Sequence, residues 1–227
     1  MSAGEEQAAG AQARWLEGWE APVDSMGDAA ACPSRLSERQ RRDAGLWYDA
    51  NNDPYARAER LRARRLTHRL NALDPADEEG KRVILEELFG AIGPDVELLP
   101  PFQCDCGYPI SIGEGSFINY NAYFMDGAAI TIGAHVYIGP NCGLYTAQHP
   151  LRWQDRNTGL EQALPIVVED NCWLGADVKV LAGVTIGAGS VIAAGSLVTR
   201  DIPSGVLAMG SPCRVVRPIT EEDAVDR

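Results

Sequence analysis

The chain has 227 residues, of which 45% are hydrophobic and 23% charged, and its formal net charge at pH 7 is -12. This composition is typical of a globular protein with a sizeable core, and the negative charge argues against nucleic acid as a general partner. No apolar run approaches the ~20 residues of a membrane span, and the first residues lack the apolar segment of a secretory signal. We therefore expect a cytoplasmic protein without membrane contact.

The cysteines do not form a recognisable disulfide or metal motif. Cys104 and Cys106 are separated by one residue, so in an extended chain they point to opposite faces, and no C-x-x-C pair exists. We therefore predict reduced thiols and no metal site. The six cysteines are Cys32, Cys104, Cys106, Cys142, Cys172 and Cys213.

Residues 1–33 are rich in Ala, Gly and Glu and show no periodicity, which predicts a disordered tail. Helical signals fill residues 34–95. Ser34 or Ser37 is expected to cap a first segment that ends near Asp49. Asp53-Pro54 and Asp74-Pro75 each offer an N-cap followed by proline at N1, and so predict two further helices. Their predicted core-facing residues are Leu61, Leu66, Leu70 and Leu73, then Val83, Ile84, Leu85, Leu88 and Phe89.

Six arginines lie between Arg57 and Arg69. Such a group is compatible with a phosphate-binding patch or with a solvated helix face, and helical charge runs favour the solvated face.

A period of six organises Ile110 to Ser204, within a predicted β-helix domain over residues 96–218. Neither an α-helix nor an ordinary strand requires this repeat, whereas a prism does, because each hexad supplies one short flat face and one corner. The period therefore predicts a hexapeptide β-helix. Its inward positions are Ile112, Ile118, Phe124, Ile132, Ile138, Leu144, Val168, Leu174, Val180, Ile186, Ile192 and Val198, and small or β-branched residues recur two places before them at Ser116, Ala122, Cys172, Val178, Val184, Ser190 and Ser196.

The repeat is interrupted at two places. Residues 145–165 match no hexad, which predicts a loop ejected from the prism and a place for function. This loop carries His149, one of only three histidines. A shorter irregularity over Met125–Ala129 predicts a bulge at a corner that carries Asp126. After Ile202-Pro203 the chain is expected to leave the prism as an extended arm, and residues 219–227 form an acidic tail.

Three features are candidates for chemistry. His149 is either catalytic or structural, and its place in the ejected loop favours catalysis. Trp173 precedes an inward leucine, so we expect it to point outward from a corner and to be covered by a ligand or a second subunit. Asn119-Tyr120-Asn121 is either part of a site or a tight turn satisfied by its own side chains.

These features resemble the maltose/galactoside O-acetyltransferase family of hexapeptide-repeat proteins, which includes a nodulation-factor acetyltransferase. The resemblance extends from Gly45 to about Pro218. It rests on motifs that occur in order along the chain: Gly45-Leu46-Trp47-Tyr48-Asp49 with Asp53-Pro54, Asp105-Cys106-Gly107-Tyr108, Asn119-Tyr120-Asn121, Met125-Asp126, Ile138-Gly139-Pro140-Asn141, Tyr145-Thr146-Ala147-Gln148-His149-Pro150, Arg156–Glu161, Asn171-Cys172-Trp173-Leu174-Gly175 and Ala194-Gly195-Ser196-Leu197-Val198-Thr199-Arg200.

The resemblance implies a left-handed parallel β-helix and a homotrimer with active sites between subunits. It also implies acetyl-CoA as donor and a sugar-type hydroxyl as acceptor. The roles that it implies are His149 as general base with Asn119; Asp49, Asp105, Tyr120, Asp126 and Glu161 on the acceptor side; and Trp173, Ala176, Ala194, Thr199, Arg200, Arg214 and Arg217 on the CoA side. Cys106, Pro109 and Arg200 stand where the family usually has Tyr, Asn and Lys, and the first two put the identity of the sugar in doubt.

The implied mechanism is chemically consistent. A thioester is already activated, so no Ser or Cys nucleophile is required, but a hydroxyl needs a base to remove its proton as it attacks. Histidine, with a free pKa near ~6.5, is suited to this task. A backbone N–H near Ala176 is our candidate donor to the developing oxyanion.

Three alternatives remain. A xenobiotic, antibiotic or other biosynthetic acyltransferase on the same fold is the nearest. A non-enzymatic hexapeptide scaffold is the second. A zinc hydrase would need three histidine ligands per site, whereas His68 is predicted on a helix and only His135 and His149 lie within the repeat region.

Overall fold

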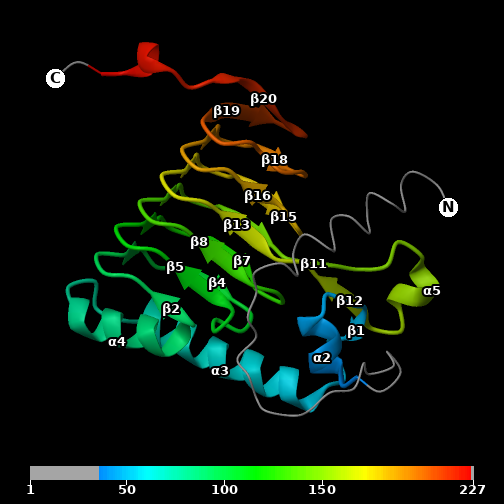
Figure 1. Ribbon diagram of the computed structural model, residues 1–227. Helices are drawn as coiled ribbons and strands as arrows, with labels where there is room; N and C mark the ends of the chain where they lie inside the picture. Colours follow the sequence, from blue (N-terminus) through cyan, green and yellow to red (C-terminus); the bar gives the residue numbers. More distant parts are fainter. Residues whose placement is uncertain (1–35, 226–227) are drawn as a thin grey trace, which may run out of the picture. The chain divides into compact units, whose positions relative to one another are not determined.

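The computed structural model describes residues 36–225. These residues form one compact unit that begins at Leu36. The predicted tail over residues 1–33 and the candidate cap Ser34 lie outside the described residues. Figure 1 shows helices at the base of the unit and a stack of parallel strands above them.

The stacked strands form three sheets, and one strand from each sheet makes one coil of the β-helix. The fold class predicted from the period of six is therefore confirmed. The first sheet contains β2 (Ala91–Ile92), β5 (Ile110–Ile112), β8 (Ile130–Ile132), β13 (Ile166–Val168) and β16 (Thr185–Ile186). The second contains β3 (Glu97–Leu98), β6 (Phe117–Ile118), β9 (Tyr137–Ile138), β14 (Trp173–Leu174), β17 (Val191–Ile192), β19 (Val206–Gly210) and β20 (Cys213–Pro218). The third contains β4 (Phe102–Cys104), β7 (Ala122–Met125), β10 (Gly143–Tyr145), β15 (Lys179–Leu181) and β18 (Leu197–Val198).

The core of the prism is built from the repeated inward positions. All twelve predicted inward residues are buried, and none is more than 3% exposed. Like residues lie above one another because the strands pair in register: Ile112 pairs with Ile132, which pairs with Val168. Burial of apolar area at ~25 cal/mol per Å² makes each added coil stabilise its neighbours.

Two of the three corner columns carry candidate site residues predicted from the sequence. The Asn119 edge comprises the turns from the second sheet to the third, at residues 119–121, 139–142, 175–178 and 193–196. The His149 edge comprises the turns from the third sheet to the first, at residues 105–109, 126–129, 146–165, 182–184 and 199–201. The strands of the third sheet separate these two edges.

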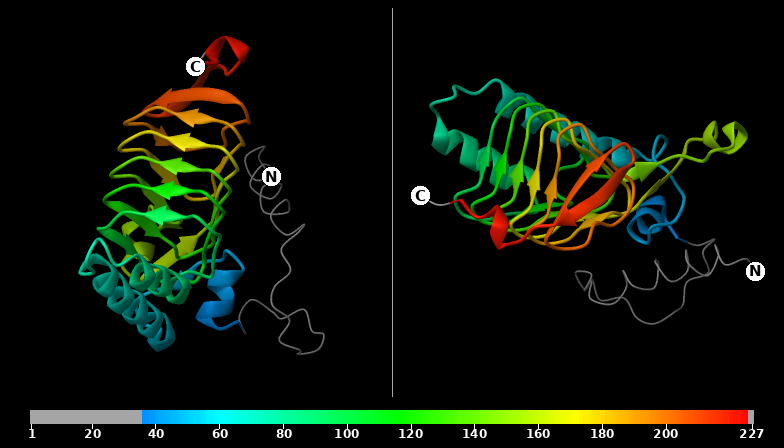
Figure 2. Two further views of the ribbon diagram at one scale, coloured as in Figure 1. Left: turned by 90° about the vertical axis from the view of Figure 1, so that its left-hand side faces the viewer. Right: turned by 90° about the horizontal axis from the view of Figure 1, so that it is seen from above.

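Three helices cover the first coils: α2 (Glu38–Asp43), α3 (Pro54–Asn71) and α4 (Glu78–Leu88). The two longer helices lie beneath the stack in the left view of Figure 2. The side-chain amide of Asn71 makes the two hydrogen bonds that a neighbouring strand would make with Phe102. It donates to the Phe102 carbonyl oxygen at 2.9 Å and accepts from the Phe102 N–H at 2.9 Å. Arg82 donates to the carbonyl oxygens of Gly93 and Ile92. The helical segment thus satisfies backbone groups at the edge of the first coil.

The helix predictions are right in outline and wrong in four details. The first segment ends at Asp43 instead of near Asp49, which belongs to strand β1 (Tyr48–Asp49). Ser37 caps α2 in a capping box with Gln40. The third predicted helix begins at Glu78 instead of Pro75, because Asp77 accepts from the Gly80 N–H while Asp74 caps a preceding turn. Leu61 and Val83 were expected in the core but are 49% and 54% exposed. Leu61 precedes Leu70 by nine residues, which places it on the opposite face of α3.

The ejected loop over residues 145–165 has its own structure. It contains β11 (Ala147–Gln148), the short helix α5 (Trp153–Arg156) and β12 (Leu160–Ala163). Strand β12 pairs antiparallel with β11 and also with β1 (Tyr48–Asp49), which comes from the helical segment. The loop, called the His149 hairpin below, is therefore held by a sheet that joins distant parts of the sequence.

The C-terminal prediction needs a correction. Strand β20 is extended as expected, but it folds back antiparallel on β19 instead of leaving the prism. Leu207 then pairs with Arg217, so the last arginines lie on the uppermost coil. The chain closes with a short 3-10 helix over Glu221–Asp223.

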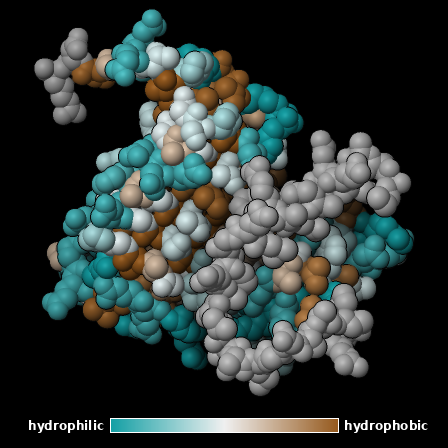
Figure 3. Space-filling model, in the orientation of Figure 1, coloured by the Kyte–Doolittle hydropathy of each residue, from teal (hydrophilic) through white to brown (hydrophobic). Residues whose placement is uncertain are grey.

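Outside the core, Figure 3 shows a surface over the coils that mixes hydrophobic and hydrophilic residues. Over the described residues, no helix has the length and apolar character needed to cross a membrane. The five cysteines within the described range are unpaired and buried.

Candidate active site

His149 lies just after β11, at the start of the exposed part of the hairpin. Its Nδ1 is 3.0 Å from the carbonyl oxygen of Leu160. Because a carbonyl oxygen only accepts hydrogen bonds, Nδ1 carries the proton when the ring is neutral, and Nε2 holds a free lone pair. About half of the side chain is exposed. The hairpin therefore fixes the tautomer and presents Nε2 as a proton acceptor.

The carboxylate of Glu161 lies near Nε2 of His149. Its Oε2 lies 4.0 Å from His149 Nε2, and its Oε1 accepts a hydrogen bond from the Tyr48 hydroxyl. This contact follows from the sheet register, in which Tyr48 of β1 pairs with Glu161 of β12. Burial, reinforced by the Glu161 carboxylate, raises the pKa of Tyr48, so the phenol remains a donor. A carboxylate at this distance stabilises an imidazolium ion that forms at His149.

A pocket of about 480 Å³ opens beside Glu161 between α3, β1 and the His149 edge. We call it the Tyr48 pocket. Tyr48, Asp105 and Glu161 supply polar oxygens to its wall. The remaining lining residues are Arg42, Ala50, Asn51, Ala56, Arg57, Arg60, Arg64, Cys106 and Gly127.

Asp126 supports the wall of this pocket from behind. It is fully buried at the predicted corner bulge, and its carboxylate accepts the backbone N–H groups of Asp105, Cys106 and Gly107 at 2.7, 3.0 and 2.5 Å. Burial outweighs these hydrogen bonds and raises the pKa of Asp126 to about 6. The residue does not line the pocket, so it influences the acceptor side through the segment that it holds.

The segment over 105–107 places two side chains in the pocket. Asp105 accepts a hydrogen bond from the Tyr123 hydroxyl at 2.8 Å. Burial, followed by the effect of the Asp126 carboxylate, raises the pKa of the Cys106 thiol. Cys106 is therefore a neutral residue in the wall of the pocket.

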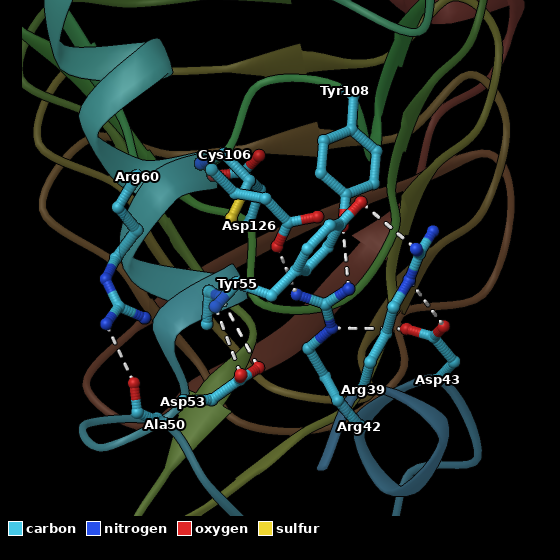
Figure 4. A network of polar contacts seen from close by, with 12 residues as sticks. Arg39, Arg42, Asp43, Ala50, Asp53, Tyr55, Arg60, Cys106, Tyr108 and Asp126 are labelled. Carbon is cyan, nitrogen blue, oxygen red and sulfur yellow. Dashed lines mark hydrogen bonds and ion pairs between the residues drawn. The ribbon is translucent and has the colours of Figure 1, made fainter. Parts of the chain in front are cut away.

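Arg42 closes the floor of the pocket through a buried polar network (Figure 4). Its guanidinium contacts Glu59 at 3.0 Å, Asp43 at 3.1 Å and the Tyr108 hydroxyl at 2.7 Å. The side chains of Arg42 and Glu59 are both at most 10% exposed, so the ion pair is shielded from solvent. These contacts occupy Arg42 and hold α2 against α3 and the first coil.

Asp49 is placed differently from the other acceptor-side candidates. Its carboxylate accepts from the Asn52 side chain at 2.8 Å and from the N–H groups of Asn51 and Asn52 at 3.0 Å. The hydrogen bond from the Asn52 side chain is the main reason that the pKa of Asp49 is lowered. Asp49 lines a separate shallow cavity near the start of α3 and does not line the Tyr48 pocket.

The remaining candidates lie away from His149 within one chain. Asn119 and Tyr120 lie on the Asn119 edge, and Asn119 Oδ1 accepts from the Tyr120 N–H at 2.8 Å, as in a tight turn. Ala176 and Ala194 lie higher on the same edge. Their backbone N–H groups make no hydrogen bond with another residue in the range 36–225. They are therefore free to donate to a bound molecule.

The charged candidates for the CoA side are spread over the upper coils. Thr199 and Arg200 are exposed at the top of the His149 edge. Arg214 and Arg217 lie on β20. The Arg217 guanidinium forms a bidentate salt bridge with the Asp223 carboxylate, with N–O distances of 2.6 and 2.8 Å. Trp173 is 55% exposed, as predicted, but it lies within strand β14 instead of at a corner.

Comparison with known proteins identifies the chain. A family model described as the maltose acetyltransferase hexapeptide capping motif matches residues 41–93, and one described as the bacterial transferase hexapeptide (six repeats) matches residues 165–200. A Saccharomyces cerevisiae protein whose name proposes acetyltransferase activity is 46% identical over 180 residues, which cover 79% of this chain and 92% of the relative. The chain belongs to the maltose/galactoside O-acetyltransferase family. It is thus an acyl-CoA-dependent acetyltransferase.

Solved structures agree with this membership of the family. A maltose O-acetyltransferase from Clostridium difficile 630 is 40% identical with a TM-score of 0.80, over 82% of this chain and 99% of that chain. A galactoside acetyltransferase in complex with coenzyme A is 34% identical with a TM-score of 0.80, over 83% and 94%. A hexapeptide-repeat acetyltransferase from Vibrio cholerae in complex with acetyl-CoA is 40% identical with a TM-score of 0.76, over 82% and 100%.

Sequence reasoning missed two parts of this family member's site. Tyr48 was named only within a motif, and its role as the donor to Glu161 depends on the β1–β12 pairing. The arginines of α3 were interpreted as a solvated face, although three of them line the Tyr48 pocket. Their spacing of three and four residues was the available signal, because it places them on one helix face. Within residues 36–225, no cluster of three or more His, Cys, Asp or Glu side chains is arranged to hold a metal ion.

Proposed function

We propose that the chain transfers an acetyl group from acetyl-CoA to a hydroxyl of a sugar or sugar-like acceptor, directly and in a ternary complex. His149 acts as the general base. The observation that carries this proposal is the hydrogen bond between His149 Nδ1 and the Leu160 carbonyl oxygen, which leaves Nε2 as the acceptor nitrogen. His149 does not itself line the Tyr48 pocket, but its Nε2 lies 4.0 Å from Oε2 of Glu161, which does. An acceptor hydroxyl bound at the Glu161 end of the pocket would be near this nitrogen.

In this mechanism Nε2 removes the hydroxyl proton as the oxygen attacks the thioester carbonyl. Glu161, fixed by the Tyr48 hydroxyl, stabilises the imidazolium ion that results. The imidazolium ion then returns the proton to the departing CoA thiolate. A backbone N–H on the Asn119 edge, with Ala176 as the first candidate, donates to the oxyanion.

These groups require a second copy of the chain. His149 and the Asn119 edge are separated by the third sheet within one subunit, so Asn119, Ala176 and Ala194 would come from a neighbour in a homotrimer. Tyr137 and Trp173 support this arrangement, since they are adjacent in the sheet register and each is 55% exposed. Large apolar side chains that are exposed side by side are typical of association surfaces.

Acetyl-CoA is the proposed donor, and CoA-bound relatives support it. Arg200 and Arg214 are exposed cations in an acidic protein and suit the phosphates of CoA, as does Arg217 once released from Asp223. On the acceptor side, Asp105 and Glu161 would bind hydroxyl groups. Asp126 would position Asp105, while Asp49 and Tyr120 would act from the margins of the site.

The reaction is tested by mass spectrometry of products from acetyl-CoA with a panel of sugars, sugar phosphates, uronic acids and aminosugar antibiotics. O-acetylation of a sugar-type acceptor is the expected result. Exclusive acetylation of antibiotics would contradict the proposed acceptor class, and the absence of any acetylated product would contradict the whole proposal.

The role of His149 is tested by His149→Ala. General-base catalysis contributes ~10²–10⁴-fold, so kcat should fall by about that factor while the melting temperature and CoA affinity stay unchanged, because the hairpin lies outside every coil. His68→Ala, on the exposed face of α3, is the control and should keep wild-type turnover. Near-normal turnover of His149→Ala per folded subunit would remove His149 from the mechanism.

A further inference from the structure

Three arginines on one face of α3 enter the Tyr48 pocket. Arg57, Arg60 and Arg64 are spaced by three and four residues, so their side chains project in one direction, and all three line the pocket. The other arginines of this helix are Arg62, Arg65 and Arg69, none of which lines it. The arginine run is therefore divided between the pocket and the outer surface.

None of the three pocket arginines forms a salt bridge with an acidic side chain of residues 36–225, although Arg57 lies near enough to Asp49 to help lower its pKa. Arg57 Nε donates to the carbonyl oxygen of Asn51 at 2.7 Å, and Arg60 Nη2 donates to that of Ala50 at 2.8 Å (Figure 4 shows the Arg60 contact). A guanidinium group has five N–H donors, so each anchored arginine retains donors for another group. In contrast, Arg42 in the same pocket is neutralised by Glu59.

The charges in the pocket are also separated in space. The carboxylates of Asp105 and Glu161 come from the His149 edge and β12, and each accepts a tyrosine hydroxyl. The unpaired guanidinium groups all come from α3. One side of the pocket is therefore acidic and adjoins the base, and the other is cationic, in a chain whose net charge is -12.

We propose that the acceptor carries an anionic group, a carboxylate or a phosphate, and that Arg57, Arg60 and Arg64 bind it. The reacting hydroxyl then lies at the end occupied by Glu161 and His149. Guanidinium groups bind both anions through paired, charge-assisted hydrogen bonds. Small residues, Ala50, Ala56 and Gly127, leave room between the two ends. This inference rests on the proposed function, since it specifies the acceptor of the same site.

The first test measures binding and does not depend on turnover. The full chain is titrated by calorimetry with matched sugars: glucose and galactose, their 6-phosphates and their uronic acids. At least one anionic member should bind tenfold or more tightly than its neutral parent, and added salt should weaken the preference. The phosphate and uronate arms identify the anion. If no anionic sugar binds more tightly than its parent, the inference is wrong.

The second test uses Arg57→Gln, Arg60→Gln and Arg64→Gln, with Arg65→Gln as the matched control on the same helix. Hydrogen bonds to charged groups contribute enough for roughly a tenfold change in affinity each. Each pocket variant should therefore raise the KM or Kd of the anionic acceptor about tenfold and leave the neutral parent and acetyl-CoA unaffected, whereas Arg65→Gln should match the wild type. An increase in the KM of acetyl-CoA instead would assign the arginines to the donor and overturn the inference.

The two tests separate this inference from the proposed function. Arginine-dependent binding of an anionic sugar without acetyl transfer would refute the proposed reaction and keep the anion site. Acetylation of neutral sugars with no effect of the arginine variants would keep the reaction and refute the anion site.

Discussion

The stacked coils and the Tyr48 pocket region bury polar groups in opposite ways. Inside the coils the buried polar side chains are serines, such as Ser116 and Ser190, each of which donates to a backbone carbonyl at 2.8 Å. Among residues 36–225, the charged residues that are buried are Arg42 and Asp126, and both lie outside the coil strands, next to the pocket. In this part of the chain, buried charge therefore lies outside the regular coils.

The geometry of stacking explains this difference. Each inward position of a coil lies about 4.8 Å from the same position of the next coil. A charge at a repeated position would therefore face either its own kind or a hydrocarbon layer, and both arrangements are unfavourable in a medium of low dielectric constant. A corner or an ejected loop has no such restriction. The coils serve as a stable, uncharged support, and chemistry is confined to the irregular segments attached to them.

Phe124→Ala tests the coil side of this comparison and should have the largest effect on stability. Phe124 is fully buried and packs edge-on against Phe102, with ring centroids 5.2 Å apart. Removing such a ring costs ~3–5 kcal/mol, which denaturant unfolding at a fixed protein concentration would measure. Turnover per folded subunit should be retained. Thr131→Ala, on the outer face of the first sheet, is the control and should stay within ~0.5 kcal/mol.

A fall in the kcat of Phe124→Ala that exceeds its loss of folded protein would contradict the comparison. It would show that the coil interior transmits strain to the site and does more than support it.

The division between regular coils and irregular segments also explains which features of the molecule could be predicted from the sequence. The twelve inward positions predicted from the six-residue period are all buried, whereas Ile110, Ile130 and Ile166, two residues earlier in the strands of the first sheet, are buried as well and were not predicted. His149 was identifiable because it interrupts that period. The hydrogen bond to Leu160 and the ion-pair distance to Glu161 were not, since they depend on the pairing of β12 with both β11 and β1, which are about 100 residues apart. Which arginines of α3 line the pocket could not be predicted either, because it depends on which face of the helix packs against the pocket.

The folding back of β20 was missed for a related reason. Ile202-Pro203 was taken as the start of a departing arm, although β19, which follows it, still pairs in parallel with β17. A turn that contains Pro212 instead returns the chain to β19, where the strand edge of the last coil is available for pairing. Edge pairing of this kind is a tertiary effect that has no period in the sequence.

Asp126 tests the pocket side of the comparison through the pH dependence of stability. Burial raises its pKa from 3.8 to about 6, so between these values the folded chain binds a proton that the unfolded chain has released. The contribution of Asp126 to stability therefore falls as the pH rises from about 4 to about 6. This difference in proton affinity corresponds to about 3 kcal/mol at most.

The measurement compares the unfolding free energy of the wild type with that of Asp126→Asn, which does not titrate, across this pH range. The stability of the wild type relative to the variant should decrease with rising pH. An increase would mean that the three backbone donors dominate over burial and that the site is organised to hold a carboxylate anion.

Asn71→Ala examines the junction between the two regions and should have the smallest effect. Its amide makes two hydrogen bonds to the backbone of Phe102 in β4, at the open edge of the third sheet. Each bond contributes ~0.5–1.5 kcal/mol, so the variant should lose ~1–3 kcal/mol in denaturant unfolding, while Arg65→Ala, an exposed position on α3, should lose less than ~0.5 kcal/mol. Because α3 also carries the pocket arginines, a loosened junction should raise the KM of the acceptor more than that of acetyl-CoA. Equal effects on both substrates would show that α3 stabilises the molecule as a whole and does not separately position the pocket.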